Sequence, residues 1–238
     1  ALAYALGANP AQGLRKIKEK NFARWVSGLR DAPATEKLEA LTVNISAGGR
    51  AVRDMFLLAR VCLLLDPSGP LRLGPMAFFP DGLGPVVAGA YKKNNSAEVQ
   101  ILTEGMGSGL VAEATVGDDR PTSKRVQLEA VRIQEIVARD APGQGLERAL
   151  YELCPGFPCQ SPLVKKRSAM SLDSLMNALE LAAANPIRAT ELLDRHLTGF
   201  IARQSTGLQF LVDRLRSTGD SHSAVVLATL DVLEAVQR

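Results

Sequence analysis

The sequence predicts a mostly helical, two-lobed protein with one small β-element, and three observations lead there. The aromatic content is only 5%, so Leu, Ala and Val build most of the core, as is typical of helix-rich proteins. From Met55 to Leu65 only Arg60 is polar. From Thr122 onward, apolar residues recur at helical spacing. We expect an arm at 1–13, a helical lobe with a Pro/Gly-rich segment at 14–85, a β-element at 86–121 and a helical lobe at 122–238.

The apolar run from Met55 to Leu65 is predicted to be a central core helix. It is too short to cross a bilayer, which needs about 20 apolar residues. It is also too apolar for a surface helix, in which polar residues recur every turn. Pro67 prevents continuation of the helix. A buried strand at Val61–Leu65 is the competing interpretation, but the length of the run favours a helix because strands are usually shorter.

The first 44 residues are expected to form an arm and two helices. The arm carries the apolar residues Leu2, Tyr4 and Leu6, which fit either a frayed terminus or an exchange arm that docks on a neighbouring subunit. One amphipathic helix is predicted over 14–30, with Leu14, Ile17, Phe22, Val26 and Leu29 near one face. A second helix is predicted over 34–44, with Leu38, Leu41 and Val43 facing inward.

The middle of the chain is expected to hold an ordered loop followed by the only sheet. Residues 67–85 combine prolines, which remove backbone donors, with glycines and apolar residues, so we predict a packed loop without regular structure. Residues 86–91 and 97–103 are predicted to be strands of a hairpin, because Lys92–Ser96 has hairpin-turn chemistry. Residues 110–116 are a third strand or a helix. The sheet is therefore expected near residues 86–116.

The rest of the chain is predicted to be helical. Helices are expected from Thr122, over 146–153, from Ser171, over 185–203, over 206–217 and over 222–237. Ser171 is a predicted N-cap, and Asn185-Pro186 is a start signal for the next helix. The helix from Ser171 is defined by Leu172, Leu175, Met176, Leu179 and Leu181. The apolar face of the last helix is predicted to be Val225, Val226, Leu230, Leu233 and Val236.

Motifs for catalysis or metal binding are weak in this sequence. Gly105–Gly109 resembles a phosphate loop only in part, because Leu110 stands where a third glycine belongs. Cys154 and Cys159 have no second cysteine pair for zinc. A local disulfide requires their Cα atoms to approach within about 7 Å, and two free thiols are the favoured interpretation. His196 and His222 lie in predicted helices, and no nucleophile elbow accompanies them. We therefore predict a non-enzyme without metal or cofactor.

Basic residues are the best functional lead. The net charge is +3 with a pI near 8.9, and residues 14–60 alone carry ten Lys/Arg against five Asp/Glu. Four clusters are candidate phosphate contacts: Arg15, Lys16, Lys18, Lys20 and Arg24; Lys92 and Lys93; Lys124 and Arg125; and Lys165, Lys166 and Arg167. Separate clusters suit tracking of a phosphate backbone, although each one alone is commonly a solvated face.

Three functions follow from these features. The first is a non-enzymatic, self-assembling structural protein that coats or packages an anionic partner, RNA above all, as a viral nucleocapsid or matrix protein does. The second is a helical protein–protein adaptor. The third is a nucleotide-using enzyme built on Gly105–Gly109. The odd number of cysteines, three, argues against a disulfide-built secreted domain. We expect an intracellular, reducing location or a virion, and no membrane span.

Overall fold

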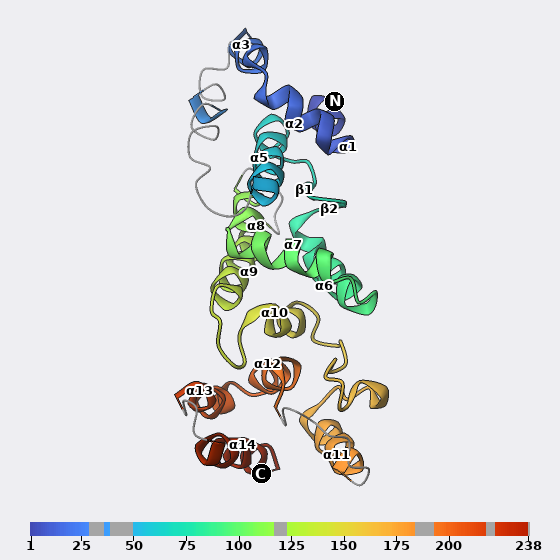
Figure 1. The fold of residues 1–238 in the computed structure, drawn as a ribbon, viewed down its shortest axis with the longest axis vertical. Coiled ribbons are helices and arrows are strands. Elements are labelled where there is room, and N and C mark those ends of the chain that lie inside the picture. Colours follow the sequence, from blue (N-terminus) through green and yellow to red (C-terminus); the bar gives the residue numbers. More distant parts are fainter. Residues whose placement is uncertain (29–35, 39–49, 117–122, 184–192, 218–221, 238) are drawn as a thin grey trace. The chain divides into compact units, whose positions relative to one another are not determined.

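The computed structural model describes residues 1–28, 36–38, 50–116, 123–183, 193–217 and 222–237. Helices dominate these residues, and one two-stranded antiparallel sheet accompanies them (Figure 1). The predicted fold class, mostly α with minor β, is therefore confirmed. The chain forms two compact units, Ala1–Gln134 and Glu135–Arg238. None of the helices in the described ranges has both the length and the apolar character needed to span a membrane.

The first unit is organised around helix α5, Arg50–Leu65. The predicted core helix is confirmed: Leu57, Leu58, Val61 and Cys62 of α5 are buried together with residues from the N-terminal helices. The helix ends before Pro67, as the sequence indicates. The other elements of this unit are α1 (Leu2–Ala8), α2 (Pro10–Lys18), α3 (Lys20–Gly28), β1 (Leu71–Leu73), β2 (Met76–Phe78), a 3₁₀ turn (Pro80–Gly82), α6 (Leu83–Lys92), α7 (Ser96–Gly107), α8 (Leu110–Glu113) and most of α9 (Ser123–Val137).

The single helix predicted over 14–30 is wrong, because two shorter helices occupy this segment. Glu19 ends α2 in an extended conformation, with φ −70° and ψ 131°. The predicted inward residues Ile17 and Val26 are nevertheless buried, one on each helix. Of the helix predicted over 34–44, only residues 36–38 are described; they are helical, and Leu38 is buried.

The sheet lies in the segment that we predicted to have no regular structure. Leu71 pairs with Phe78 and Leu73 with Met76 in an antiparallel hairpin, and Gly74 occupies the turn with φ +57°. Leu71 and Leu73 are fully buried, so alternate residues of β1 face the core. The prediction of an unstructured loop over 67–85 is therefore wrong, whereas the prediction of an ordered, packed segment is correct.

The sheet predicted near residues 86–116 is wrong, because α6, α7 and α8 occupy these residues. The polar stretch after α6 joins two helices and is not a hairpin turn. Asn94 adopts a left-handed φ of +50°, and the Asn95 side chain accepts a hydrogen bond from Glu98 N as the N-cap of α7. Asn residues serve both purposes. The burial of Leu102 and Met106, four residues apart, shows the helical period.

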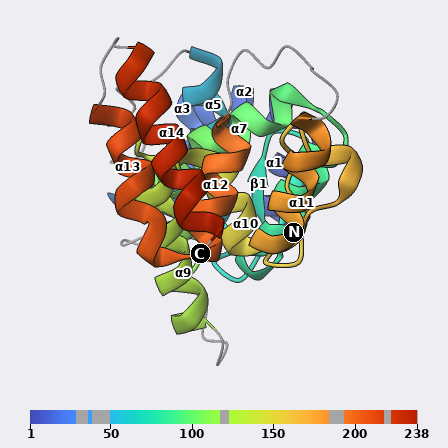
Figure 2. The same cartoon turned by 90° about the horizontal axis from the view of Figure 1, so that it is seen from below.

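The second unit holds the remaining helices, with α10 packed on α12 and α14 packed on α13 (Figures 1 and 2). Gly199 of α12 sits against the backbone of α10, where an added Cβ would lie 2.9 Å from Arg148 N. This glycine therefore sets how closely the two helices approach. The elements are α10 (Gly145–Leu153), a 3₁₀ turn (Lys165–Arg167), α11 (Leu172–Ala183), α12 (Arg195–Gln204), a 3₁₀ turn (Thr206–Leu208), α13 (Gln209–Ser217) and α14 (His222–Gln237).

Several predictions for the second unit need correction. The helix predicted over 185–203 is not continuous, because Leu193 and Asp194 are non-helical and α12 begins at Arg195; the predicted start at Asn185-Pro186 lies outside the described residues. In α11, Leu175 is buried, whereas Leu181 is exposed. The N-cap at Ser171 is confirmed, since its hydroxyl accepts a hydrogen bond from Ser174 N at 3.2 Å.

The buried face of α14 also differs from the prediction. Val236 is buried as expected, but Val225, Val226 and Leu230 are exposed. The residues that face the unit are instead Ala228, Thr229, Val232 and Val236. The sequence around α14 is apolar on more than one side, so hydrophobic periodicity alone did not identify the side that packs.

Candidate nucleic-acid interface

Helix α2 separates an apolar inner face from a basic outer face. Asn9 caps the helix, its side-chain oxygen accepting a hydrogen bond from Gln12 N at 3.2 Å. Ile17 is buried in the core cluster around α5. Arg15, Lys16 and Lys18 are exposed. Because the apolar side of the helix is anchored, the three cations are held on the solvent side.

Two of these cations form ion pairs within the unit. Lys16 Nζ lies 3.0 Å from Glu19 Oε2, and Lys18 Nζ lies 2.6 Å from Asp54 Oδ1 on α5. The lysine side chains of both pairs remain about half exposed, at 57% and 46%. Exposed pairs of this kind contribute about 0–1 kcal/mol. A polyanion that brings several phosphates can therefore compete with Glu19 for Lys16.

Helix α3 follows α2 after a single intervening residue, Glu19, and carries another exposed cation, Arg24. Val26 is 1% exposed and Phe22 packs against the same core cluster, whereas Arg24 and Trp25 are exposed. Helices α2 and α3 also contact each other. Residues 10–28 carry five Lys/Arg and one Glu, a net charge of +4. Of the clusters that we predicted to bind phosphate, this segment carries the most Lys and Arg residues.

The other predicted cations lie on separate elements. Lys92 and Lys93 are exposed at the end of α6, not at a hairpin tip, and Lys93 Nζ is 4.0 Å from Glu98 Oε2. Lys124 and Arg125 are exposed near the start of α9. Lys165, Lys166 and Arg167 form an exposed 3₁₀ turn in the second unit. The structure thus joins only the α2 and α3 residues into one continuous basic segment.

The N-terminal residues predicted as an exchange arm form helix α1, which packs on α5 of the same chain. Leu6 is buried in the core cluster and Leu2 is partly buried against it. The Cys62 thiol donates a hydrogen bond to Ala3 O at 3.5 Å. Tyr4 is 68% exposed, and the Arg72 guanidinium lies 5.4 Å from the centre of its ring. Exchange of this helix with a neighbouring subunit stays a prediction.

The glycine motif predicted as a weak nucleotide loop lies at the end of a helix. Gly105 and Gly107 belong to the last turn of α7, and Gly109 has φ +80° between α7 and α8. A dinucleotide loop follows a strand and opens a helix. Here α7, not a strand, precedes the motif, so the βαβ context is missing.

A buried polar cluster between α10 and α12 was missed by the sequence reasoning. Tyr151 Oη accepts a hydrogen bond from Gln160 N at 2.9 Å and lies 3.1 Å from His196 Nδ1. The Ser161 hydroxyl donates to Asp194 Oδ2 at 2.6 Å. Asp194 thus holds Ser161, and His196 meets Tyr151. The position of Asp194 as N-cap of α12 was the available sequence signal.

Burial favours the neutral forms of Cys159 and His196 in this cluster. Burial raises the pKa of the Cys159 thiol to about 11, so it is protonated at neutral pH and a weak nucleophile. Burial also lowers the pKa of His196, although Glu147 and Asp194 oppose this shift. Cys62, Cys154 and Cys159 are free thiols, as we predicted for Cys154 and Cys159.

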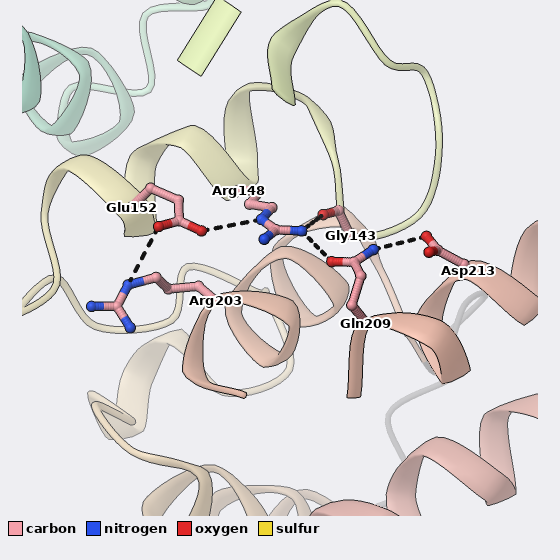
Figure 3. Close-up of polar contacts among 6 residues, drawn as sticks. All are labelled: Gly143, Arg148, Glu152, Arg203, Gln209 and Asp213. Atoms are coloured by element: carbon pink, nitrogen blue, oxygen red, sulfur yellow. Dashed lines mark hydrogen bonds and ion pairs between the residues drawn. The ribbon is translucent and has the colours of Figure 1, made fainter. Parts of the chain in front are cut away.

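A second buried network surrounds Arg148, which is only 8% exposed (Figure 3). Its guanidinium donates to Glu152 Oε1 and to Gly143 O, each at 3.3 Å, and to Gln209 Oε1. Gln209 Nε2 in turn donates to Asp213 Oδ1 at 2.8 Å. Arg148 thus ties α10 to the loop before it and to α13, which is a structural role.

Helix α14 exposes apolar side chains that its own unit does not cover. Leu227 and Leu230 are 62% and 55% exposed, and Val226 beside them is 40% exposed. These residues are spaced three and four apart and so share one helix face. Contiguous exposed apolar surface of this kind is typical of interaction sites.

Within the described ranges, no three His, Cys, Asp or Glu side chains come together as a metal site would require. Comparisons with protein-family models, curated proteins and solved structures gave no match to the chain.

Proposed function

We propose that this chain is a non-enzymatic, self-assembling structural protein that binds RNA through its backbone phosphates, in a nucleocapsid- or matrix-like role. The observation that carries the proposal is the basic outer face of α2 and α3. Ile17 and Val26 fix these helices on the core, while Arg15, Lys16 and Arg24 remain exposed. Cations in this arrangement neutralise phosphates without reading bases, so binding would be weakly sequence-specific. Such a protein belongs in a reducing cell interior or in a virion.

Two charge-reversed variants with the same change in net charge test the RNA-binding face. The first is Arg15→Glu, Lys16→Glu, Arg24→Glu. The second, the matched control, is Lys165→Glu, Lys166→Glu, Arg167→Glu in the second unit. Lys18 is left unchanged because its ion pair with Asp54 joins α2 to α5, whereas the pair of Lys16 with Glu19 joins neighbouring residues. Binding of an unstructured, dye-labelled RNA is followed by fluorescence anisotropy.

We expect the first variant to bind at least about tenfold more weakly, since each lost phosphate contact weakens electrostatic binding. The control should lose less. A greater loss of RNA affinity in the control would indicate that RNA binds at the 165–167 turn and would contradict binding at α2 and α3. RNA affinity unchanged in both variants would contradict the proposal, provided that circular dichroism shows intact helices.

Self-assembly is supported by the exposed face of α14. Packing of Leu227 and Leu230 against a second copy would stabilise the assembly by about 25 cal/mol for each Å² of apolar surface that is removed from water. We expect Leu227→Asp, Leu230→Asp to lower the mass measured by light scattering after size-exclusion chromatography. Leu128→Asp, at a 74% exposed residue of α9, is the control. A monomeric wild type would contradict self-assembly.

The same α14 face favours a second candidate function, a protein–protein adaptor. In that case the basic residues would only keep the protein soluble. An adaptor would purify with a protein partner and with an absorbance ratio free of nucleic acid. The assembly protein would instead carry nucleic acid at low salt and release it at high salt.

A further inference from the structure

The side chain of Trp25 stands out on the basic face of α3. It is 49% exposed, whereas Phe22 and Val26 on the same helix turn into the core. Trp is a large aromatic side chain that is rarely fully buried, and here its exposure leaves a flat ring open beside a cation. It follows Arg24 directly and is the only tryptophan of the chain.

The ring of Trp25 is held in place from one side. Its centre lies 6.3 Å from the ring of Phe22, with an angle of 30° between the two planes. Phe22 is itself packed against the core cluster around α5. A ring braced in this way loses little side-chain entropy when a flat partner stacks on it.

We propose that Trp25 stacks on an unpaired nucleobase, so that the α2–α3 face binds single-stranded nucleic acid in preference to a duplex or a base-free polyphosphate. This inference rests on the proposed function. Arg15, Lys16 and Arg24 contact phosphates, and Trp25 receives a base from the same strand. Cationic grooves combined with aromatic rings are the general means of binding single strands, because every base offers a π-face. Bases inside a duplex are already stacked and cannot reach the ring.

A membrane surface is the competing ligand for a basic helix with an exposed Trp. An interfacial helix, however, inserts a continuous apolar face among lipid chains. In α3 the apolar residues Phe22 and Val26 already pack on the protein core. Among the side chains of α3 whose burial the structure describes, Trp25 is the one large apolar group left for insertion, so the arrangement favours nucleic acid.

The test uses the intact chain and its single tryptophan as the reporter. An oligouridylate, an RNA duplex, inorganic polyphosphate and anionic phospholipid vesicles are titrated separately at low salt. We expect the oligouridylate to quench Trp25 fluorescence in proportion to the bound fraction. Polyphosphate and the duplex should bind with little quenching. Anisotropy of labelled oligouridylate then compares Trp25→Ala, Trp25→Phe and wild type, with competition by polyphosphate.

Trp25→Ala should lower the affinity for oligouridylate about 5- to 150-fold, the range for loss of one base–aromatic stack. Trp25→Phe should retain part of it, and both variants should keep the wild-type affinity for polyphosphate. Equal loss for both ligands, or binding of oligouridylate without quenching, would overturn the stacking proposal and leave phosphate binding intact. A blue shift on vesicles with no response to oligouridylate would assign the face to a membrane and also overturn it. Failure of every polyanion to bind would overturn both proposals.

Discussion

Arg60 and Glu113 form a two-point ion pair between α5 and α8: Arg60 Nε lies 2.7 Å from Glu113 Oε2, and Nη2 lies 2.8 Å from Oε1. Arg60 is the only polar residue between Met55 and Leu65. The hydrogen bonds to Glu113 raise the pKa of Arg60 above its ordinary value. Arg60, the single polar residue in the apolar run, thus links the core helix α5 to α8 through an ion pair.

Replacing Arg60 with Met should lower the free energy of unfolding by about 1 kcal/mol. The two-point geometry strengthens the pair, but solvent weakens it because the side chains are 25% and 46% exposed. Urea denaturation measures the loss. Lys16→Met, which removes the more exposed pair with Glu19, is the control and should change stability less. Equal losses in the two variants would contradict a special role for Arg60.

Gly199→Ala should destabilise the α10–α12 contact by about 1–3 kcal/mol, the usual cost of overpacking. The added Cβ would lie 2.9 Å from Arg148 N and 3.2 Å from Arg148 Cα, and backbone atoms cannot move aside cheaply. Gly89→Ala in α6 is the matched control, since nothing lies within 4 Å of its Cβ position. That change should raise stability by up to about 1 kcal/mol. Thermal unfolding of both variants checks this, and a Gly199→Ala protein as stable as wild type would refute the close approach.

Arg148→Met should weaken the second unit by about 3–5 kcal/mol, because Glu152 would be left buried without its nearer cation. The side chains of the pair are only 9% and 11% exposed. Hydrogen–deuterium exchange of α10 and α12 amides should speed up accordingly. Arg203→Met is the control, since Arg203 lies 3.9 Å from Glu152 and is 29% exposed. Similar exchange in both variants would show that the Arg148 network is dispensable.

The stability of the second unit should fall as the pH drops below about 6.5, the ordinary pKa of histidine. The pKa of folded His196 is depressed by burial, so the unfolded chain binds the proton more readily. The stabilising contribution is therefore present above the unfolded pKa and lost as pH falls through the folded pKa. His196→Gln keeps an acceptor for the Tyr151 hydroxyl but does not titrate. Unfolding measured across this range should depend less on pH in that variant; an unchanged pH profile would exclude His196 as the cause.

The core helix and most C-terminal helices could be predicted from the sequence because their signals are local. The run at Met55–Leu65 has one polar residue, and Ser171 is a helix cap by its chemistry alone. The strands predicted over 86–116 were wrong because Val- and Ala-rich stretches fit either structure. Tertiary contacts, such as the burial of Leu102 and Met106 on one helix face, decided for helix.

The candidate interface was predictable in composition but not in arrangement. The basic residues from Arg15 to Arg24 follow directly from the sequence, whereas the partnership of Lys18 with Asp54, 36 positions away, depends on how α2 meets α5. The pair of Phe22 and Trp25 is local, three positions apart, but the sequence does not show that Phe22 packs on the core while Trp25 stays exposed. A long-range pair such as Lys18 and Asp54 leaves no local signal in a sequence.

The salt dependence of RNA binding tests the proposed function most directly. For single strands, the logarithm of the binding constant falls against the logarithm of the salt concentration with a slope of about −0.7 per phosphate contacted. Three exposed cations on α2 and α3 therefore predict a slope of about −2 or steeper for an unstructured RNA. The Arg15→Glu, Lys16→Glu, Arg24→Glu variant should flatten it. An affinity of the wild type that stays constant from low to moderate salt would contradict a phosphate-binding surface.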